Sequence, residues 1–446
     1  MRKQIARQRN SIIRFAVLLT VLLSAKASAT LAQPLSKAEQ QQVIDSLGAA
    51  LNRYYVFPDK ALDISSRLQK QLQGRRYDSL QGREAFVARL NQDLHSLSGD
   101  RHLQLSYDPG LEERIRKFDP EGQKDSTRFL RERQQNFYFR KLEILPGNIG
   151  YLACTGFADT GSEASAAVQA AITFLSHTEA LILDLRENDG GSGAMAAAVA
   201  GHFFRHKRYN GRSFNRIDNK WTEEWILPAQ PVLEQPVYIL VSHRTFSAAE
   251  GLAYALQQSK RATIVGQSTR GGAHLTRTFA LGNGYVGFLP FARSEQAQTL
   301  TDWEGTGVLP DHKEEDSNSL WSTQRIVLEQ LSQAATTDST KQRCLQWQIR
   351  RLLSLHPDQK QAPVANMLKA FAGQFEEFRF FIQENSLYCA KNGTITNAMA
   401  MRFIAPTIFQ LDNDCQVAFL VGSTGSVDQI RLYWSDGYTE LVARSK

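Results

Sequence analysis

The sequence has few cysteines, no long apolar run and almost no excess of one charge over most of its length. Only four of the 446 residues are cysteine, and no CxxC pair or His/Cys cluster has the spacing of metal ligands. We therefore expect no metal and no fold that depends on disulfide bonds. Cys389 and Cys415 could still pair, whereas Cys154 lies in an apolar strand pattern and is expected to be a buried thiol.

The net charge of +7 is concentrated at the N-terminus. Six of the 52 basic residues lie in the first 29 positions, which leaves 46 basic against 45 acidic residues and removes the electrostatic argument for a nucleic-acid partner. Residues 1–29 have the pattern of a signal peptide: a basic start, an apolar run from Phe15 to Leu23 and a cleavage site after Ala29 or Ala32. The run is too short for a membrane span of about 20 residues. We predict an exported protein, periplasmic or extracellular, with a retained anchor helix as the alternative.

The composition, 42% hydrophobic and 22% charged, is typical of a globular protein of about two or three domains. Residues 34–135 predict an N-terminal helical bundle and a linker. Ser36-x-x-Glu39 is a capping box, and the apolar residues after it recur with helical spacing. Two further amphipathic helices end near Gly74 and Ser98, and the charged stretch near 110–135 has no periodic pattern.

Residues 136–312 alternate between apolar strands and helices. Strands are expected from Ile149, Ala180, Val237 and Ala262, with helices between them. This alternation predicts an α/β core with a mainly parallel sheet covered on both faces. Near its end, Asn283-Gly284 between two strand-like runs predicts a hairpin with a type I′ turn.

The last third is expected to contain two parts. Residues 313–384 predict a helical connector, with helices over 323–333, 342–355 and 364–383. Residues 385–446 predict a small antiparallel β module with four short strands, over 402–410, 416–421, 429–434 and 438–442. The module is either structural or a docking site for substrate or the cell envelope.

One stretch places a serine at a strand-to-helix corner. A buried strand from Val237 is followed by a turn and then by Ser247-Ala-Ala-Glu250 at the start of a helix. Ser247-x-x-Glu250 can be read as a simple capping box. It can also be read as a nucleophile beside free backbone N–H groups, where an oxyanion would be stabilised.

A second stretch is rich in glycine. Gly191-x-Gly193-x-x-Ala196 follows a strand and formally matches a dinucleotide-binding fingerprint, but the acidic residue expected about 20 positions later is missing. We therefore expect no nucleotide cofactor. A tight turn is one alternative reading. The other is that Gly190 or Gly191 brings its N–H close to a substrate carbonyl, because no side chain stands in the way.

Four motifs in order carry a family resemblance. They are Asp184–Gly191, Thr245–Glu250, Gly266–Ala273 and Trp303–Asp311. Together they resemble the tail-specific or tricorn-type serine peptidases, also called C-terminal-processing peptidases, in the branch that includes interphotoreceptor retinoid-binding protein. The resemblance covers about residues 36–312 and implies a ClpP/crotonase-like α/β fold.

The resemblance implies a role for particular residues. Ser247 matches the nucleophile, with the N–H groups of Ala248 and of Gly190 or Gly191 as the oxyanion hole. The lysine base of the C-terminal-processing branch is replaced by Gly272, which excludes a Ser–Lys dyad.

The histidine branch instead places its base where this sequence has His102, and histidine titrates in the range that suits proton transfer from a serine. Glu304 matches the acid that orients the base. Tricorn-type enzymes have a serine before the histidine, whereas this chain has Arg101. His274, near the active-site loop, is the alternative base.

These features predict an exported serine endopeptidase. No PDZ insertion fits between residues 100 and 140, so the helices and a sheet edge would hold extended or unfolded polypeptide substrates, and a homo-oligomer is possible. The first alternative is a catalytically silent protein on the same scaffold that binds an apolar ligand or a peptide. The second, a nucleotide-linked oxidoreductase, rests only on the weak glycine fingerprint.

Overall fold

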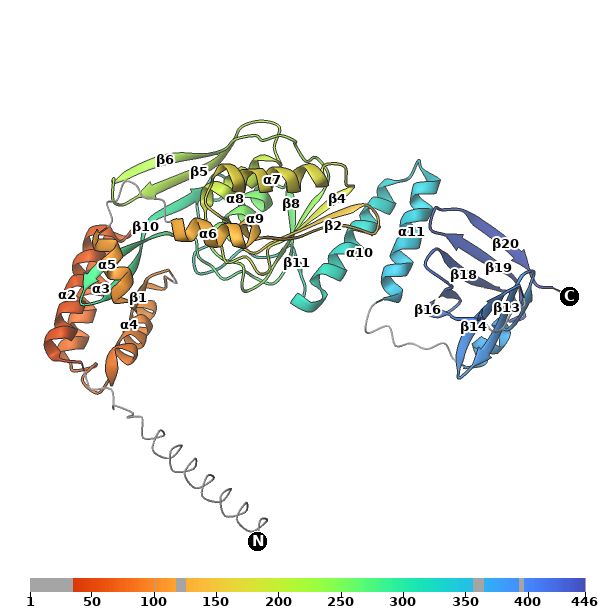
Figure 1. Cartoon of the computed structure of the whole chain (residues 1–446), viewed down its shortest axis with the longest axis horizontal. Coiled ribbons are helices and arrows are strands. Elements are labelled where there is room, and N and C mark those ends of the chain that lie inside the picture. The colour runs from red at the N-terminus through yellow and green to blue at the C-terminus, as the bar shows by residue number, and fades with distance from the viewer. Residues whose placement is uncertain (1–34, 101, 118–125, 356–364, 393–396, 446) are drawn as a thin grey trace, which may run out of the picture.

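The computed structural model describes residues 35–100, 102–117, 126–355, 365–392 and 397–445. Figure 1 shows helices at one end of the long axis, an α/β unit in the middle and a β-rich module at the other end. The predicted signal peptide, with its cleavage sites after Ala29 and Ala32, and Arg101 lie outside the described residues. Within the described ranges, no helix combines the length and the apolar character that a membrane span requires.

Three helices form the N-terminal part, as predicted. They are α2 (Lys37–Tyr54), α3 (Pro58–Gln73) and α4 (Gly82–Ser98). The expected cap begins α2, because the Ser36 hydroxyl accepts the Glu39 N–H at 3.1 Å. The apolar core beneath these helices also includes residues of a β-hairpin from the α/β unit, Leu281, Tyr285 and Leu289. The helices are therefore built onto that hairpin and do not form a separate bundle.

The prediction of a linker near 110–135 is corrected by the structure, because the stretch contains two helices. They are α5 (Pro109–Lys117) and α6 (Ser126–Gln134). Ion pairs four residues apart support both helices, Arg116 with Glu112 and Arg128 with Glu132. Among the side chains of these helices that the structure describes, those that are buried are the carboxylates of the two pairs. Neither helix buries an apolar stripe, so the periodicity of apolar residues does not indicate them.

A mainly parallel sheet forms the centre, as predicted. Its strand order is β11-β8-β7-β4-β3-β2. The strands are β2 (Phe139–Leu145), β3 (Ile149–Cys154), β4 (Ala180–Asp184), β7 (Val237–Val241), β8 (Ala262–Gly266) and β11 (His312–Lys313). Only β2 is antiparallel to its neighbour. The carboxyl ends of β4 and β7 lead into the glycine-rich loop and the Ser247 turn, so the fold brings these two motifs together.

Helices cover both faces of this sheet, which confirms the prediction. Those on one face are α7 (Ser162–Leu175), α8 (Gly193–Gly201) and α9 (Ala248–Gln258). Those on the other face are α10 (Asp316–Ala334) and α11 (Ser339–Ser354). Alternate residues of each strand serve the two faces: Leu183 packs with α7 and α8, whereas Ile182 packs with α10.

A second, antiparallel sheet joins the helical part to the core. Its strands are β1 (Gln104–Tyr107), β5 (Arg208–Asn215), β6 (Lys220–Ile226), β9 (Leu275–Gly282) and β10 (Tyr285–Gln296). The predicted hairpin is confirmed as β9–β10, with φ of 53° at Asn283 and 84° at Gly284, as a type I′ turn requires. The β5–β6 hairpin was not predicted, because its mostly exposed residues lack an apolar alternation.

The C-terminal part contains more strand than expected. A helix was predicted over 364–383, but α12 (Ala365–Phe371) is followed by β12 (Gly373–Phe375) and β13 (Phe378–Gln383). Phe378 and Phe380 are buried on either side of exposed Arg379, which is the period of a strand. The β module therefore begins near residue 373, and the boundary predicted at 385 falls in the turn between two paired strands.

The β module consists of two antiparallel sheets around one core. The remaining strands are β14 (Ser386–Lys391), β15 (Met399–Ala400), β16 (Arg402–Ala405), β17 (Ile408–Gln410), β18 (Cys415–Val421), β19 (Val427–Trp434) and β20 (Thr439–Ala443). Cys389 and Cys415 are both buried here as free thiols. Cys154 is also free, and burial raises the pKa of its thiol to about 11, which agrees with an inert buried cysteine.

Candidate active site

Ser247 lies at the corner between β7 and α9 in a backbone conformation that few side chains adopt. Its φ is 54° and its ψ is −121°. A non-glycine residue there costs roughly 1–3 kcal/mol, and such strain is concentrated at functional sites. A nucleophilic serine in a sharp strand-to-helix turn has the same setting. Ala248 is the first residue of α9, so its N–H precedes the hydrogen bonds of the helix.

Glu250 fixes this corner. Its carboxylate is fully buried and accepts the Ser247 N–H at 2.7 Å, which is the capping contact read from the sequence. It also accepts the N–H groups of Gly271 and Gly272 at 2.6 and 2.8 Å and the Thr269 hydroxyl at 2.5 Å. Burial raises the pKa of the Glu250 carboxyl, against the opposing effect of these hydrogen bonds. Glu250 therefore joins the serine turn to the 269–272 loop, a role that the capping box alone did not indicate.

The glycine-rich loop lies directly against the serine turn. A Cβ at Gly190 would lie 2.8 Å from the Ser247 Cβ and 3.2 Å from the Ala248 nitrogen. At Gly191 a Cβ would lie 2.2 Å from the Phe157 carbonyl oxygen. Both glycines have φ above 100°, so close approach and backbone conformation each require glycine here.

The two glycine N–H groups differ in availability. The N–H of Gly190 donates to the side-chain oxygen of Asn188 at 2.9 Å. The main-chain carbonyl of Asn188 accepts the Phe246 N–H at 3.0 Å. Asn188 thus ties the loop to the residue before Ser247. Because the Gly190 N–H is engaged, Gly191 is the better second donor beside Ala248.

His102 lies between the serine turn and Glu304. Its ring packs on Phe246 with centroids 4.7 Å apart, and its Nδ1 lies 3.6 Å from the Glu304 Oε2. The histidine is 9% exposed. Among the described residues, no hydrogen bond joins the Ser247 hydroxyl to His102, and 3.6 Å is an ion-pair distance, too long for a hydrogen bond. The structure therefore brings the predicted base and acid together in outline, with contacts that substrate binding would have to tighten.

Gly272 explains how a histidine can occupy this place. A Cβ at position 272 would lie 2.1 Å from the Phe246 ring and 2.6 Å from the His102 Cε1. A lysine at this position would therefore collide with the two rings. The absence of that lysine, noted in the sequence, is a steric requirement of the His102 arrangement.

Glu304 is held by backbone donors. Its Oε2 accepts the N–H groups of Ala273 and His274 at 2.6 and 3.2 Å. The neighbouring Trp303 donates its indole N–H to the Gly272 carbonyl at 3.2 Å. The carboxylate is thus fixed to the same loop that Glu250 fixes from the other side.

His274 is less well placed than His102 to act as the base. Its Nδ1 lies 2.9 Å from the Asp100 Oδ2, and its Nε2 lies 3.6 Å from the Asp302 Oδ2. Burial lowers the pKa of His274, but the hydrogen bond to Asp100 and the nearby carboxylates of Asp302 and Glu304 outweigh burial and raise the pKa to about 9. With both nitrogens facing carboxylates and a proton already bound, this ring cannot readily accept the proton of Ser247.

Asp100, His102 and Glu304 offer ligand atoms within 4.8 Å of one another. We do not assign them as metal ligands, because the Asp100 carboxylate is already used. It accepts the His102 N–H at 2.9 Å, the His274 Nδ1–H at 2.9 Å and the Tyr55 hydroxyl at 3.1 Å. The group is better described as a buried hydrogen-bonded charge cluster.

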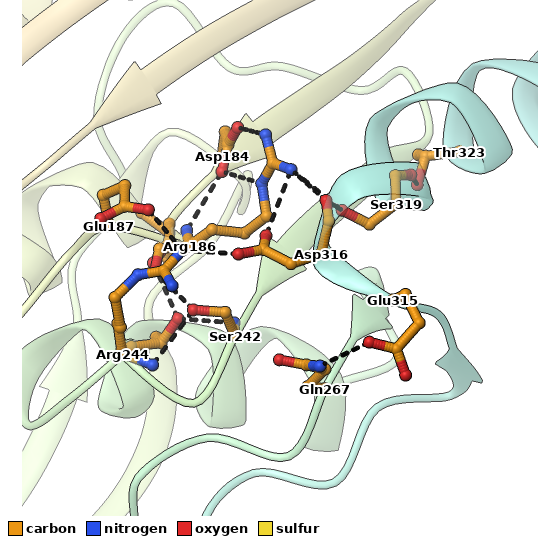
Figure 2. Close-up of polar contacts among 12 residues, drawn as sticks. Asp184, Arg186, Glu187, Ser242, Arg244, Gln267, Glu315, Asp316, Ser319 and Thr323 are labelled. Carbon is orange, nitrogen blue, oxygen red and sulfur yellow. Dashed lines mark hydrogen bonds and ion pairs between the residues drawn. The ribbon is translucent and has the colours of Figure 1, made fainter. Parts of the chain in front are cut away.

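An arginine cluster lies behind the two loops, and the sequence did not predict it. Arg186 donates to both Asp184 oxygens at 2.9 and 2.6 Å and to the Asp316 carbonyl at 2.7 Å (Figure 2). The Ser242 hydroxyl donates to the Arg186 carbonyl at 2.6 Å. The cluster therefore anchors the start of α10 to the segments that lead to the glycine loop and to Ser247.

Family models match two parts of the chain. Residues 148–314 match peptidase family S41, and residues 28–135 match the N-terminal domain of Peptidase_S41 in eukaryotic IRBP. Over these residues the chain is similar to peptidase family S41 and to its N-terminal domain. Both matches agree with the resemblance read from the four motifs, and the larger one includes Ser247 and Glu304.

Known proteins match this chain over part of its length. Carboxyl-terminal-processing peptidase 2, chloroplastic, of Arabidopsis thaliana is 33% identical over 181 residues, 38% of this chain and 33% of the relative. The carboxyl-terminal-processing protease of Synechocystis sp. is 30% identical over 131 residues, 29% of this chain and 30% of the relative. The match thus spans about a third of the length of these relatives. A solved lipoprotein structure from Streptococcus agalactiae aligns with a TM-score of 0.45 at 17% identity, covering 65% of this chain and 96% of that one.

Proposed function

We propose that this chain is an exported serine endopeptidase of the S41 type in which Ser247 is the nucleophile, His102 the base and Glu304 the residue that orients the base. The observation that carries the proposal is the strained serine corner, packed against the glycine loop and against the ring of His102 through Phe246. The ClpP/crotonase-like assignment of the core is part of the same proposal.

The reaction follows from this geometry. The Ser247 oxygen attacks the carbonyl carbon of a peptide bond while His102 takes the hydroxyl proton. The N–H groups of Ala248 and Gly191 stabilise the negative charge on the carbonyl oxygen. The carbon–nitrogen bond then breaks, the leaving amine receives the proton from His102, and a water activated by the same histidine releases the acyl group from Ser247.

Glu304 supports the base by charge. Its carboxylate lies 3.6 Å from His102 and favours the imidazolium that forms during each proton transfer. The substrates we propose are extended or unfolded polypeptides, because the helices and a sheet edge would hold a chain that has no structure of its own. A homo-oligomer and cleavage of a signal peptide after Ala29 or Ala32 complete the proposal.

The test is fragment analysis by mass spectrometry. An unfolded protein is incubated in EDTA with the purified chain, with Ser247→Ala, with His102→Ala and with His206→Ala, an exposed histidine that serves as the matched control. We expect fragments from the wild type and from His206→Ala. The cleavage rate of Ser247→Ala and of His102→Ala should be lower by roughly a thousandfold or more. Equal cleavage by wild type and Ser247→Ala would contradict the proposal. Absent cleavage in all four proteins would favour the alternative, a silent protein that binds an apolar ligand or a peptide.

A further inference from the structure

His274 is buried at the junction of the helical part and the α/β core. The residue is 4% exposed, and three carboxylates surround its ring. Asp100 follows helix α4, whereas Asp302 and Glu304 belong to the loop after β10. On its remaining side the ring packs edge-on against Phe57 at 5.3 Å, and Phe57 is itself covered by Lys60 and Arg293. The nearest side chains able to contact a cationic imidazole are thus three acids and one aromatic ring.

The charge of His274 follows from these neighbours. Three carboxylates this close together repel one another unless a cation lies among them. The raised pKa of about 9 makes His274 an imidazolium at neutral pH. Burial raises the pKa of Asp100, but the hydrogen bond and charge of His274 and the contacts with His102 outweigh burial and lower it. Burial also raises the pKa of Tyr55, so that its hydroxyl stays a donor to Asp100.

The His274 ring contacts both carboxylates that lie next to His102, those of Asp100 and Glu304. The Asp100 carboxylate binds the His274 ring through one oxygen and the His102 backbone N–H through the other, each at 2.9 Å. Glu304 faces the His102 ring at 3.6 Å and accepts the backbone N–H of His274 at 3.2 Å. The His274 Nδ1 also lies 3.6 Å from the same Glu304 oxygen.

We propose that His274 is a positioning residue for His102: as an imidazolium it holds Asp100 and Glu304, the two carboxylates that fix the backbone and the ring of the catalytic base. The proposal rests on the proposed peptidase function. It also accounts for Arg101, which stands before His102 where tricorn-type enzymes have a serine. The acid that faces the base is then fixed by the 273–274 loop, so a serine before the histidine is not needed.

Kinetics separate this role from a structural one. In His274→Gln the positive charge is lost, so the surroundings of His102 become more negative and hold its proton more strongly. We expect the acid limb of kcat/KM to move up by about one pH unit and kcat to fall by about a hundredfold with little change in KM. The matched control is His202→Gln, a second buried histidine, whose Nδ1 contacts the Pro231 carbonyl and whose pKa is lowered by burial and only partly restored by that contact. The control should keep the wild-type pH profile.

A folded His274→Gln with an unchanged acid limb and unchanged kcat would overturn the proposal. A second measurement does not depend on activity or on this variant folding. Nitrogen NMR of the nine histidines in the wild-type chain should show one imidazole that stays charged above pH 8. Its signal is assigned to His274 by its contacts, or by its absence from the spectrum of His274→Gln. Titration of that ring near 6.5 would also overturn the proposal.

The two experiments distinguish the inference from the function. If Ser247 neither cleaves polypeptide nor reacts with a fluorophosphonate probe, the peptidase proposal fails, and with it the role assigned to His274. The NMR titration still decides whether the charged cluster itself exists. If Ser247 reacts in the wild type and equally fast in His274→Gln at every pH, only the positioning role fails.

Discussion

The arginine cluster, which is partly buried, and the histidine cluster, which is buried, use different cations for a similar task. In one, Arg186 joins Asp184 at the end of β4 to the start of α10 (Figure 2). In the other, His274 joins Asp100 at the end of the helical part to the loop that carries Glu304. Each cluster thus ties a segment distant in sequence to the loops of the candidate site.

The two clusters differ in how the charge of their cation depends on pH. A guanidinium stays charged at every pH at which the protein folds and presents five donors in a fixed plane. An imidazole can lose its proton within a few units of neutrality. The arginine cluster is therefore a permanent attachment, whereas the histidine cluster makes the position of the candidate base sensitive to pH. The titratable cation is the one placed beside the proposed chemistry.

The largest expected effect is the loss of the arginine cation. Arg186→Met leaves Asp184, 7% exposed, buried without its positive partner, although the Tyr151 hydroxyl still donates to it at 2.7 Å. Removing one member of a buried ion pair costs about 3–5 kcal/mol. We expect urea unfolding of the core to show this loss equally at pH 6 and pH 9. The double variant Asp184→Leu/Arg186→Met should recover much of it, and a loss below about 1 kcal/mol for the single variant would show that the cluster is not an anchor.

The second effect is smaller and depends on pH. The pKa of His274 is raised from 6.5 to about 9, so the protonated ring stabilises the fold fully below about pH 6.5, and this stabilisation is lost as the pH rises through 9. The shift corresponds to roughly 3 kcal/mol. The difference in unfolding free energy between wild type and His274→Gln should therefore shrink by about that amount from pH 6 to pH 10. At the acid end, the lowered pKa of Asp100 adds stability that is lost as the pH falls below about 4.

Arg186→Met is the control for this pH effect, because its deficit should not change over the same range. A difference for His274→Gln that stays constant from pH 6 to pH 10 would mean that the ring is neutral in the folded protein. The two clusters would then not differ in the way that the structure indicates.

Local patterns in the sequence predict the regular parts of the fold well. The alternation after Ile149 predicts the parallel sheet, and Asn283-Gly284 predicts its hairpin. The pattern fails where a segment does not bury an apolar stripe, as in α5, α6 and β5–β6. It also fails over 373–383, where the predicted helix of 364–383 is replaced by the strands β12 and β13.

The candidate site divides in the same way. Ser247, Gly191 and Glu304 lie in the four motifs, and the family resemblance points to His102, so the sequence was enough to predict these residues. The residues that support them are paired over long separations: Asp100 and His274 are 174 positions apart in the sequence, and Arg186 and Asp316 are 130 positions apart. No local spacing encodes such a contact. The one available signal was Asp100, two positions before His102, whose short side chain can reach the backbone N–H of that residue.

The smallest effect concerns the exposed member of the arginine cluster. Arg244 binds Asp316 at 2.5 Å and also contacts Glu187, but its side chain is 41% exposed. Solvent and salt weaken such pairs, so we expect Arg244→Gln to lower the unfolding free energy by less than about 1 kcal/mol, and by still less in 0.5 M salt, on the order of a few tenths. Arg186→Met should show its full loss at either salt concentration. Arg244→Gln could instead lower the unfolding free energy as much as Arg186→Met does. Both arginines would then attach α10 equally, and burial would not explain why one ion pair is strong and the other weak.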